Sequence, residues 1–244
     1  MKQSIFKIES NTPLTESVFK MVLSGDVSEC VCGGFVNIAL SGKFLRRPIS
    51  VCDVSGNELT LIYKVVGSGT EQMSKLHEGE TLDILTGLGN GYDLSLSGSS
   101  PLLIGGGVGV PPMYLLAKKL IEEGKKVTVI LGFNTKSEIF YEEEFRALGA
   151  NVFVTTVDGS SGIRGFVTDA MADLTYTHIF TCGPEPMLRA VYKSCKTDGQ
   201  FSFEERMGCG FGACMGCSCK TVTGYKRICK DGPVLRKEEI LWEA

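Results

Sequence analysis

The chain has 244 residues, of which 43% are hydrophobic and 22% charged, and its formal net charge is −3. This length allows one large domain or two to three small ones with a proper core. The slight acidic excess argues against nucleic acid as a partner, because phosphate-binding surfaces are usually basic. Since no long apolar run is present and residues 1–10 lack an apolar segment, we expect no membrane span, no secretory signal and a cytoplasmic location.

The first part of the chain consists of short β segments separated by Gly, Asn, Ser and Pro. We predict strands at residues 4–9, 18–23, 35–40, 49–52 and 59–66. Several short strands with turns between them predict a small antiparallel barrel. The small polar residues 95–100 then indicate a hinge.

From Pro101 the pattern changes to alternating strands and helices. We predict strands at 102–104, 127–131, 152–157 and 178–182. Helices are expected from about residue 112, over 138–148 and over 186–195, and the first of them places Met113, Leu116 and Leu120 on one face. This alternation predicts a parallel sheet covered on both faces, with ligands bound at the carboxyl ends of its strands.

Two turns at predicted strand ends are candidate nucleotide sites. Gly105–Pro111 has the sequence GGGVGVP and leads into a helix, where free amides bind phosphate. Val110 replaces the third glycine of a G-x-G-x-x-G motif and the next strand ends without an acidic residue, so a simple Rossmann dehydrogenase is disfavoured. Cys182, before Gly-Pro, suits contact with a flat aromatic ligand. For Gly105–Pro111 the alternative is a tight turn that binds no ligand. For Cys182 the alternative is a thiol packed in the core.

Five of the ten cysteines fall within the last thirty-six residues. Cys209, Cys214 and Cys217 have the C-x₄-C-x₂-C spacing of plant-type [2Fe–2S] proteins, which need a fourth cysteine further along. We predict Cys229 as that ligand, because Cys219 is only two residues from Cys217 and a ligand from a separate strand closes a better loop. A structural zinc is the alternative, although the second paired knuckle of a zinc site is missing.

The barrel region carries individually weak signals for a phosphate-bearing ligand. Arg46 and Arg47 offer cations ahead of the small hydroxyl of Ser50. Tyr63 suits stacking on a ring, and Gly69-Thr70 offers an amide and a hydroxyl to a phosphate. On their own, Arg46 is typical of a solvated surface charge and Tyr63 of a core residue.

Together these regions resemble the ferredoxin–NADP reductase-like flavoproteins. Arg47-Pro48-Ile49-Ser50 is similar to the R-x-[YF]-[ST] flavin segment of that family, with Pro48 and Ile49 as departures. Gly69-Thr70 looks like its second flavin segment, and the turns at Gly107 and Cys182 look like its pyridine-nucleotide segments. Cys32-Gly33-Gly34-Phe35 stands where the family often has Pro-Gly-Gln-Phe, a change that we expect flavin binding to tolerate.

The module order and the ending CKDGPV at 229–234 resemble, within that family, the electron-transfer subunits of NAD-linked bacterial dihydroorotate dehydrogenases. The resemblance implies a barrel at 1–97, a nucleotide-binding α/β domain at 98–200 and a [2Fe–2S] module at 201–244. It implies NAD near Gly107 and Cys182, and a heterotetramer with two copies of an FMN-containing dihydroorotate dehydrogenase catalytic subunit. It also implies FAD bound by Arg47, Pro48, Ile49, Ser50, Ile62, Tyr63, Lys64, Gly69 and Thr70.

The resemblance implies a role in pyrimidine biosynthesis, with electrons arriving singly through the cluster and leaving FAD as a hydride to NAD⁺. The protein mainly positions the flavin in such a reaction, and no acid–base pair is needed. We therefore expect the two histidines, His77 and His178, to be structural. NAD and NADP both fit the motifs. Alternatives are a subunit of a ferredoxin:NADP or sulfide/hydrogenase-linked reductase, and a zinc-stapled interaction protein.

Overall fold

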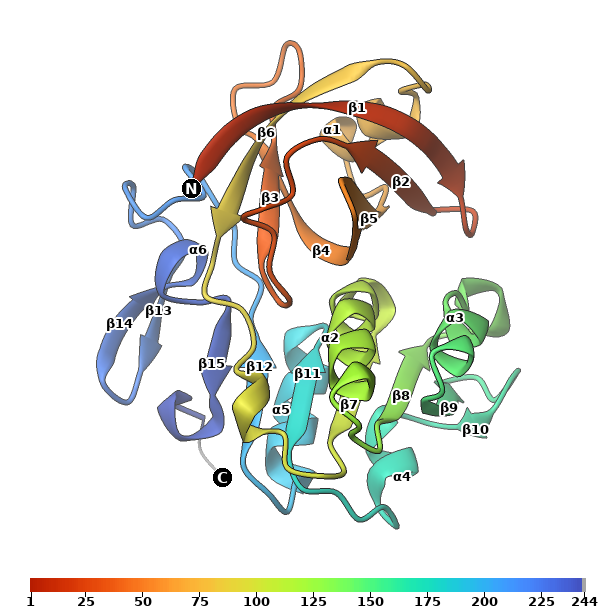
Figure 1. The fold of residues 1–244 in the computed structure, drawn as a ribbon. Helices are drawn as coiled ribbons and strands as arrows, with labels where there is room; N and C mark the ends of the chain where they lie inside the picture. The colour runs from red at the N-terminus through yellow and green to blue at the C-terminus, as the bar shows by residue number, and fades with distance from the viewer. Residues whose placement is uncertain (243–244) are drawn as a thin grey trace.

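The computed structural model describes residues 1–242 and contains a barrel, a parallel-sheet region and a C-terminal segment that leans on both. In Figure 1 the barrel lies above the sheet, and the C-terminal segment runs along the side of the two. The predicted multidomain fold, an antiparallel barrel followed by an α/β sheet, is confirmed. Among the described residues, no helix combines the length and apolarity that crossing a membrane requires.

The barrel closes through six antiparallel strands in the order β1-β2-β5-β4-β3-β6. Alternation along the strands buries one side of each, and Phe6 and Ile8 of the first strand are fully buried inside. A short helix, α1 (Ser68–Ser74), follows the fifth strand. The strands are β1 (Lys2–Pro13), β2 (Val18–Ser24), β3 (Phe35–Ile38), β4 (Arg47–Ser55), β5 (Glu58–Lys64) and β6 (Thr81–Leu88).

The sheet has seven strands in the order β10-β9-β8-β7-β11-β12-β15. Six of them are parallel, and the last pairs antiparallel with β12 at one edge. That edge strand comes from the C-terminal segment. The strands are β7 (Leu102–Gly106), β8 (Thr128–Phe133), β9 (Asn151–Thr156), β10 (Ile163–Arg164), β11 (Ile179–Cys182), β12 (Gly199–Ser202) and β15 (Val234–Arg236).

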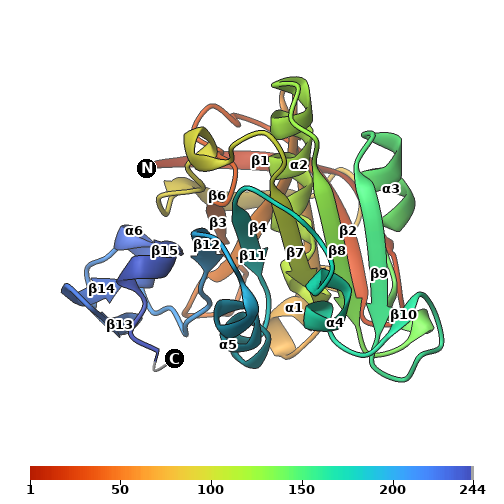
Figure 2. The same cartoon turned by 90° about the horizontal axis from the view of Figure 1, so that it is seen from below.

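Helices cover both faces of the sheet, as Figure 2 shows from below. Leu103 and Val129 belong to the core shared with the barrel, with α2 (Pro111–Glu122) and α3 (Glu142–Ala147). Leu102, Ile104 and Ile130 pack in a second core, with α4 (Val167–Met171) and α5 (Glu185–Ser194). Helix α3 is shorter than the predicted 138–148, because Tyr141 just before it adopts a left-handed backbone with φ 66°.

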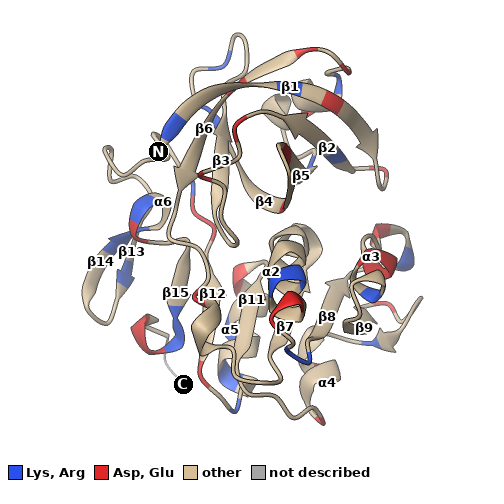
Figure 3. Ribbon diagram, viewed as in Figure 1, with Lys and Arg blue, Asp and Glu red and all other residues tan. Residues whose placement is uncertain are grey.

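The C-terminal segment contains a loop at 203–217, a hairpin of β13 (Ser218–Thr221) and β14 (Gly224–Arg227), and one turn of helix, α6 (Ile228–Asp231). The backbone N–H of Asn90 donates to the carbonyl of Gly232 at 2.7 Å and ties the segment to the end of the barrel. In the view of Figure 3, acidic and basic residues are mixed over all three parts rather than gathered on one face.

Candidate cofactor-binding sites

The four predicted cysteine ligands form two pairs. Cys209 pairs with Cys214 within the loop, and Cys217 at the end of the loop pairs with Cys229 of α6. In the first pair, the sulfur of Cys209 accepts hydrogen bonds from the amides of Ala213 at 3.2 Å and Cys214 at 3.4 Å. Burial raises the pKa of the Cys209 thiol, but amides of Phe211, Cys214 and Ala213 and the Cys214 thiol outweigh it and lower that pKa to about 6. The loop is thus arranged to stabilise a thiolate at Cys209.

The second pair is buried at the base of the hairpin. The amide of Cys229 donates to the sulfur of Cys217 at 3.4 Å, and the two residues are 2% and 1% exposed. Burial, followed by contact with Cys217, raises the pKa of the Cys229 thiol to about 12. Cys219 lies one step along β13 opposite Lys226, and no hydrogen bond joins its sulfur to these four cysteines in the described residues.

This arrangement of donors fits a two-iron cluster better than a zinc ion. A structural zinc needs four ligands converging on one point. In the described part of the chain, no three His, Cys, Asp or Glu side chains are placed to hold a single metal ion. A [2Fe–2S] cluster takes four thiolates on two irons, and the paired cysteines, with amides aimed at sulfur, suit it. The residues present therefore fit the cluster that the sequence predicts.

The predicted flavin segment brings a free cation to the start of α1. A Cβ placed on Gly69 would collide with the guanidinium of Arg47, so the glycine is what lets that side chain cross the helix start. No salt bridge joins Arg47 to a carboxylate within residues 1–242. Lys43 adds a second cation, donating to the hydroxyl of Ser68 at 3.0 Å. Two cations beside the N-terminal amides of α1 fit a diphosphate.

The other predicted flavin residues occupy three different environments. Pro48, Ile49, Ser50 and Lys64 are half-buried along β4 and β5. The Thr70 hydroxyl accepts from the amides of Val66 at 2.9 Å and Gly67 at 3.3 Å. That hydroxyl therefore organises its own turn, and the groups left for a phosphate at Gly69 and Thr70 are backbone amides.

Tyr63 and Ile62 lie in the barrel core with 2% and 3% exposure. The Tyr63 ring stacks on Phe19 at 5.9 Å between centroids, and its hydroxyl donates to Asn11 at 2.9 Å. Burial raises the pKa of Tyr63 to about 12. The Tyr63 ring therefore stacks on a protein side chain. This agrees with the core role that the sequence offers as the alternative to stacking on a ligand.

Arg46 is not the solvated charge that its sequence context suggested. Its guanidinium donates to the Asp83 carboxylate at 3.0 Å, to the Asp83 carbonyl at 3.0 Å and to the Asn37 carbonyl at 3.3 Å. These bonds fasten β3 to β6. The neighbouring arginines therefore differ: Arg46 pairs with the Asp83 carboxylate, whereas Arg47 bonds only the Leu45 carbonyl and has no carboxylate partner among the described residues.

The two predicted nucleotide turns meet at the carboxyl ends of neighbouring strands. Gly105 of β7 pairs in register with Cys182 of β11. A Cβ on Gly109 would collide with the Cys182 carbonyl, so the turns touch through backbone alone. Gly107 has a positive φ of 53°, and a Cβ there would meet no atom within 4 Å. Burial raises the pKa of Cys182 to about 12, which keeps its thiol neutral against the turn.

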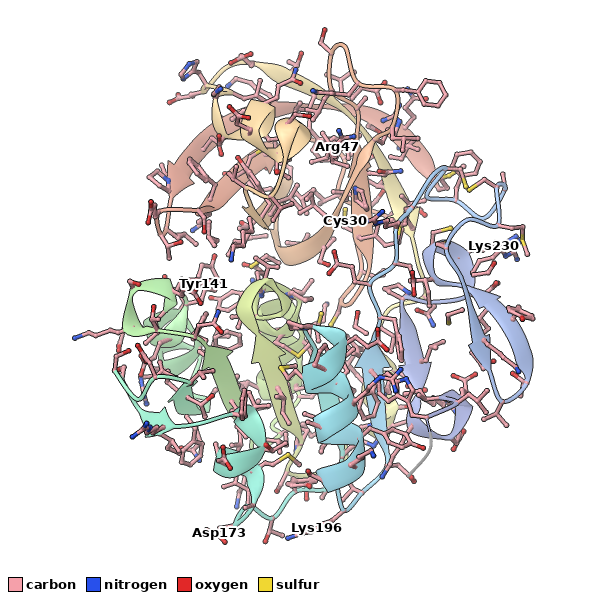
Figure 4. The ribbon with its side chains drawn as sticks, turned by 180° about the vertical axis from the view of Figure 1, so that it is seen from behind. Cys30, Arg47, Tyr141, Asp173, Lys196 and Lys230 are labelled. Carbon is pink, nitrogen blue, oxygen red and sulfur yellow. The ribbon has the colours of Figure 1, made fainter. Side chains whose placement is uncertain are left out.

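Contacts across the junction fix the barrel on the nucleotide-binding region. Lys118 of α2 pairs with Asp53 of β4, and Tyr141 contacts Cys52 of the same strand. Figure 4 shows Tyr141 on the side of the sheet region that faces the barrel, with Arg47 on the barrel itself and Lys230 on the C-terminal segment. The hydroxyl of Tyr92 donates to the Thr181 carbonyl at 3.2 Å.

A cavity of about 310 Å³ lies between the connecting segment at 90–93 and the C-terminal segment. Its charged side chains pair with one another, Arg236 with Asp93 at 3.3 Å and Lys226 with Glu239. The cavity is therefore a polar contact region between parts of the chain, and none of its lining residues is a predicted cofactor-binding residue.

Two family models match the chain. The iron-sulfur cluster binding domain of dihydroorotate dehydrogenase B matches residues 204–241, which include all four predicted cysteine ligands. The oxidoreductase NAD-binding domain matches residues 103–193, which include Gly107 and Cys182.

Curated relatives match over nearly the whole chain. A dihydroorotate dehydrogenase B (NAD(+)) electron transfer subunit from Bacillus pumilus is 42% identical over 255 residues, covering 98% of both chains. One from Fusobacterium nucleatum is 42% identical over 257 residues, covering 98% of this chain and 99% of the relative.

Solved structures give the same picture of the fold. A chain of an NADH-dependent reduced ferredoxin-NADP oxidoreductase superposes with a TM-score of 0.88 at 31% identity, covering 97% of this chain and 90% of the other. A ferredoxin NADP⁺ reductase from Neisseria gonorrhoeae superposes with a TM-score of 0.69 at 16% identity, covering 80% and 90%, a likeness of fold alone.

Proposed function

Because the chain belongs to the family of dihydroorotate dehydrogenase B (NAD(+)) electron transfer subunits, we propose that it carries electrons from an FMN-containing catalytic subunit to NAD⁺. It is an oxidoreductase component of pyrimidine biosynthesis that uses an iron–sulfur cluster, FAD and NAD. The observation that carries the proposal is the position of the cysteine loop against β3, which neighbours the predicted flavin strand β4 and so brings cluster and flavin to the same part of the barrel.

The residues of the chain bind and orient these groups. Cys209, Cys214, Cys217 and Cys229 would hold the cluster, and Arg47 with the amides of Gly69 and Thr70 would hold the FAD diphosphate. Pro48, Ile49, Ser50, Ile62, Tyr63 and Lys64 would line the flavin, the two core residues acting through backbone and packing. When bound, the cluster supplies single electrons and the flavin couples them to hydride exchange with nicotinamide at Gly107 and Cys182.

Exposed apolar side chains on the cysteine loop supply a docking surface for the catalytic subunit. Cys214 is exposed, and Phe211 and Met215 beside it are 44% and 53% exposed. Electrons entering there reach the cluster over a short path, and an apolar contact excludes water from it. We propose that the catalytic subunit covers this surface, in a heterotetramer of two copies of each chain.

The remaining parts of the proposal follow from the same family. The modules are 1–97 for FAD, 98–200 for NAD and 201–244 for the cluster, and the working location is the cytoplasm. A second candidate is a ferredoxin:NADP or sulfide/hydrogenase-linked reductase subunit. The structural neighbour with a TM-score of 0.88, a chain of an NADH-dependent reduced ferredoxin-NADP oxidoreductase, favours that candidate.

The test mixes the FAD- and iron-loaded chain anaerobically with the FMN-type dihydroorotate dehydrogenase subunit from the same source. NADH forms from dihydroorotate and NAD⁺ only when both chains are present, if the proposal holds. A parallel mixture with reduced ferredoxin and NADP⁺ tests the second candidate. Turnover with ferredoxin but not with dihydroorotate would replace the first proposal by the second.

A further inference from the structure

A single buried amide connects the barrel to the cysteine loop. Asn37 lies in β3, whose sequence FVNI is buried at every position, and it is 1% exposed. Its Nδ2 donates to the carbonyl of Cys209 at 3.3 Å. Within residues 1–242, this is the one hydrogen bond between the barrel and the loop at 203–217. In the sequence, this position is marked by a polar asparagine within the otherwise apolar run FVNI.

The loop backbone is shaped to lie directly on this amide. Gly210, next to Cys209, has a positive φ of 77°, and a Cβ there would strike Asn37 Nδ2. The loop is also held from the far side, where Arg227 donates to the Gly212 carbonyl at 2.9 Å. The position of Cys209 is thus set between one anchor on the barrel and one on the hairpin.

Asn37 itself is rigidly placed beside the flavin strand. It stands opposite Pro48 in the β3–β4 register, and Arg46 binds its carbonyl. Its Oδ1 is buried without a hydrogen-bond partner among the described residues. A half-satisfied amide in a core is less favourable than an apolar side chain of the same shape, so its presence calls for a functional reason.

We propose that Asn37 is a positioning residue that sets the separation between the cluster and the flavin. The inference rests on the proposed function, because it matters only if electrons pass between these two groups. The rate of electron transfer falls steeply with distance, so a loop released from β3 transfers electrons more slowly even when both groups stay bound. The amide acts through the Cys209 backbone and touches no reacting atom in this structure.

The test uses the FAD- and cluster-loaded full chain, reduced anaerobically with NADH, which delivers two electrons to the flavin, of which the cluster accepts one. Stopped-flow absorbance follows the flavin, and freeze-quenched EPR follows the reduced cluster. In Asn37→Leu and Asn37→Val, which both lack the donor, we expect flavin reduction at the wild-type rate. Cluster reduction should be about tenfold slower, with altered EPR g values reporting a displaced Cys209.

Gln200→Leu is the matched control, because it removes a buried carboxamide that bonds the Asp93 backbone and, among the described residues, makes no hydrogen bond to the loop at 203–217. It should lower thermal stability and leave both the cluster rate and the EPR signal unchanged. Asn37→Val also lacks the donor and has a small β-branched side chain that suits a buried strand, so it remains informative if Asn37→Leu fails to fold. An Asn37→Val chain with both cofactors and a wild-type cluster rate and spectrum overturns the inference. If NADH fails to reduce the cluster even in the wild-type chain, the proposed function is overturned rather than the role of Asn37.

Discussion

Lys118 of α2 and Asp53 of β4 form an ion pair across the junction of the barrel and the sheet, with Nζ 3.0 and 3.2 Å from the two carboxylate oxygens. The side chains are 27% and 19% exposed, so the pair is partly shielded from water. In the proposed function, FAD lies on the barrel side and NAD on the sheet side, so hydride exchange between them requires this junction to hold its geometry.

Removing one partner of this pair should loosen the junction. Lys118→Met leaves the Asp53 carboxylate partly buried and unpaired, and we expect a loss of about 1–2 kcal/mol in the free energy of unfolding, between the values for exposed and buried pairs. Urea unfolding of the cofactor-loaded chain measures it. A double-mutant cycle with Asp53→Asn should return a coupling energy, and strictly additive effects would show that the pair contributes nothing.

The fourth cluster ligand can be identified by comparing two cysteines. Cys229→Ser should abolish the visible absorbance of the cluster and the bound iron, since it breaks the buried pair with Cys217. Cys219→Ser should retain both, because Cys219 lies along β13 outside the two pairs. Iron analysis and the visible spectrum of protein purified anaerobically decide the matter. Loss of iron from Cys219→Ser with retention in Cys229→Ser would reverse the assignment.

Adjacent arginines should differ in their effect on FAD. Arg47→Gln removes a free cation at the diphosphate site, and we expect FAD affinity to fall by about tenfold to a hundredfold, the value of a charge-assisted hydrogen bond. Flavin fluorescence during titration of the FAD-stripped chain measures this.

Arg46→Gln is the control for that comparison. It breaks the bonds to Asp83 and Asn37, so it should lower the melting temperature more than it weakens FAD binding. Equal loss of FAD affinity in the two variants would contradict the division of roles between these residues.

Acid should destabilise the chain in part through His178. Burial lowers the pKa of His178 below its ordinary value near 6.5, so between the lowered pKa and 6.5 the unfolded chain binds more protons than the folded one. The stabilisation contributed by the neutral His178 ring is therefore complete above pH 6.5. It is lost as the pH falls from 6.5 through the lowered pKa of His178 in the folded chain.

The unfolding free energy of the wild-type chain should drop more between pH 7.5 and about 5 than that of His178→Gln. Urea unfolding at the two pH values measures the difference. An identical drop in the two proteins would rule out His178 as a contributor.

Local sequence patterns predicted the elements that have a regular periodicity. They did not predict the strands that form only by pairing with residues far away in the sequence. Strand β1, from its alternation, and helix α2, from its apolar face, follow from periodicity. Strand β6 was not predicted, yet it closes the barrel by pairing with β1 on one side and β3 on the other. Strand β15 has three residues, too few for any period, and only its pairing with β12 makes it a strand.

The candidate sites show the same limit. Cysteine spacing and the glycine turns indicated the cluster and nucleotide regions, because those motifs are local in sequence. The spacing could not show that Arg46 pairs with Asp83, since these partners are 37 residues apart. Nor could it show that Asn37 bonds to Cys209, 172 residues away. Long-range hydrogen bonds of this kind are determined by the assembled fold.

The antiparallel edge strand has a consequence for synthesis of the protein on the ribosome. Strand β12 is covered on its outer side by residues 234–236, which are translated more than thirty residues after it. Until they emerge, a growing chain presents an open hydrogen-bonding edge to its neighbours, the kind of edge that promotes aggregation between nascent chains. Chains stopped before Val234 should therefore accumulate as insoluble protein even with barrel and helices complete, and demand for chaperones should peak late in translation.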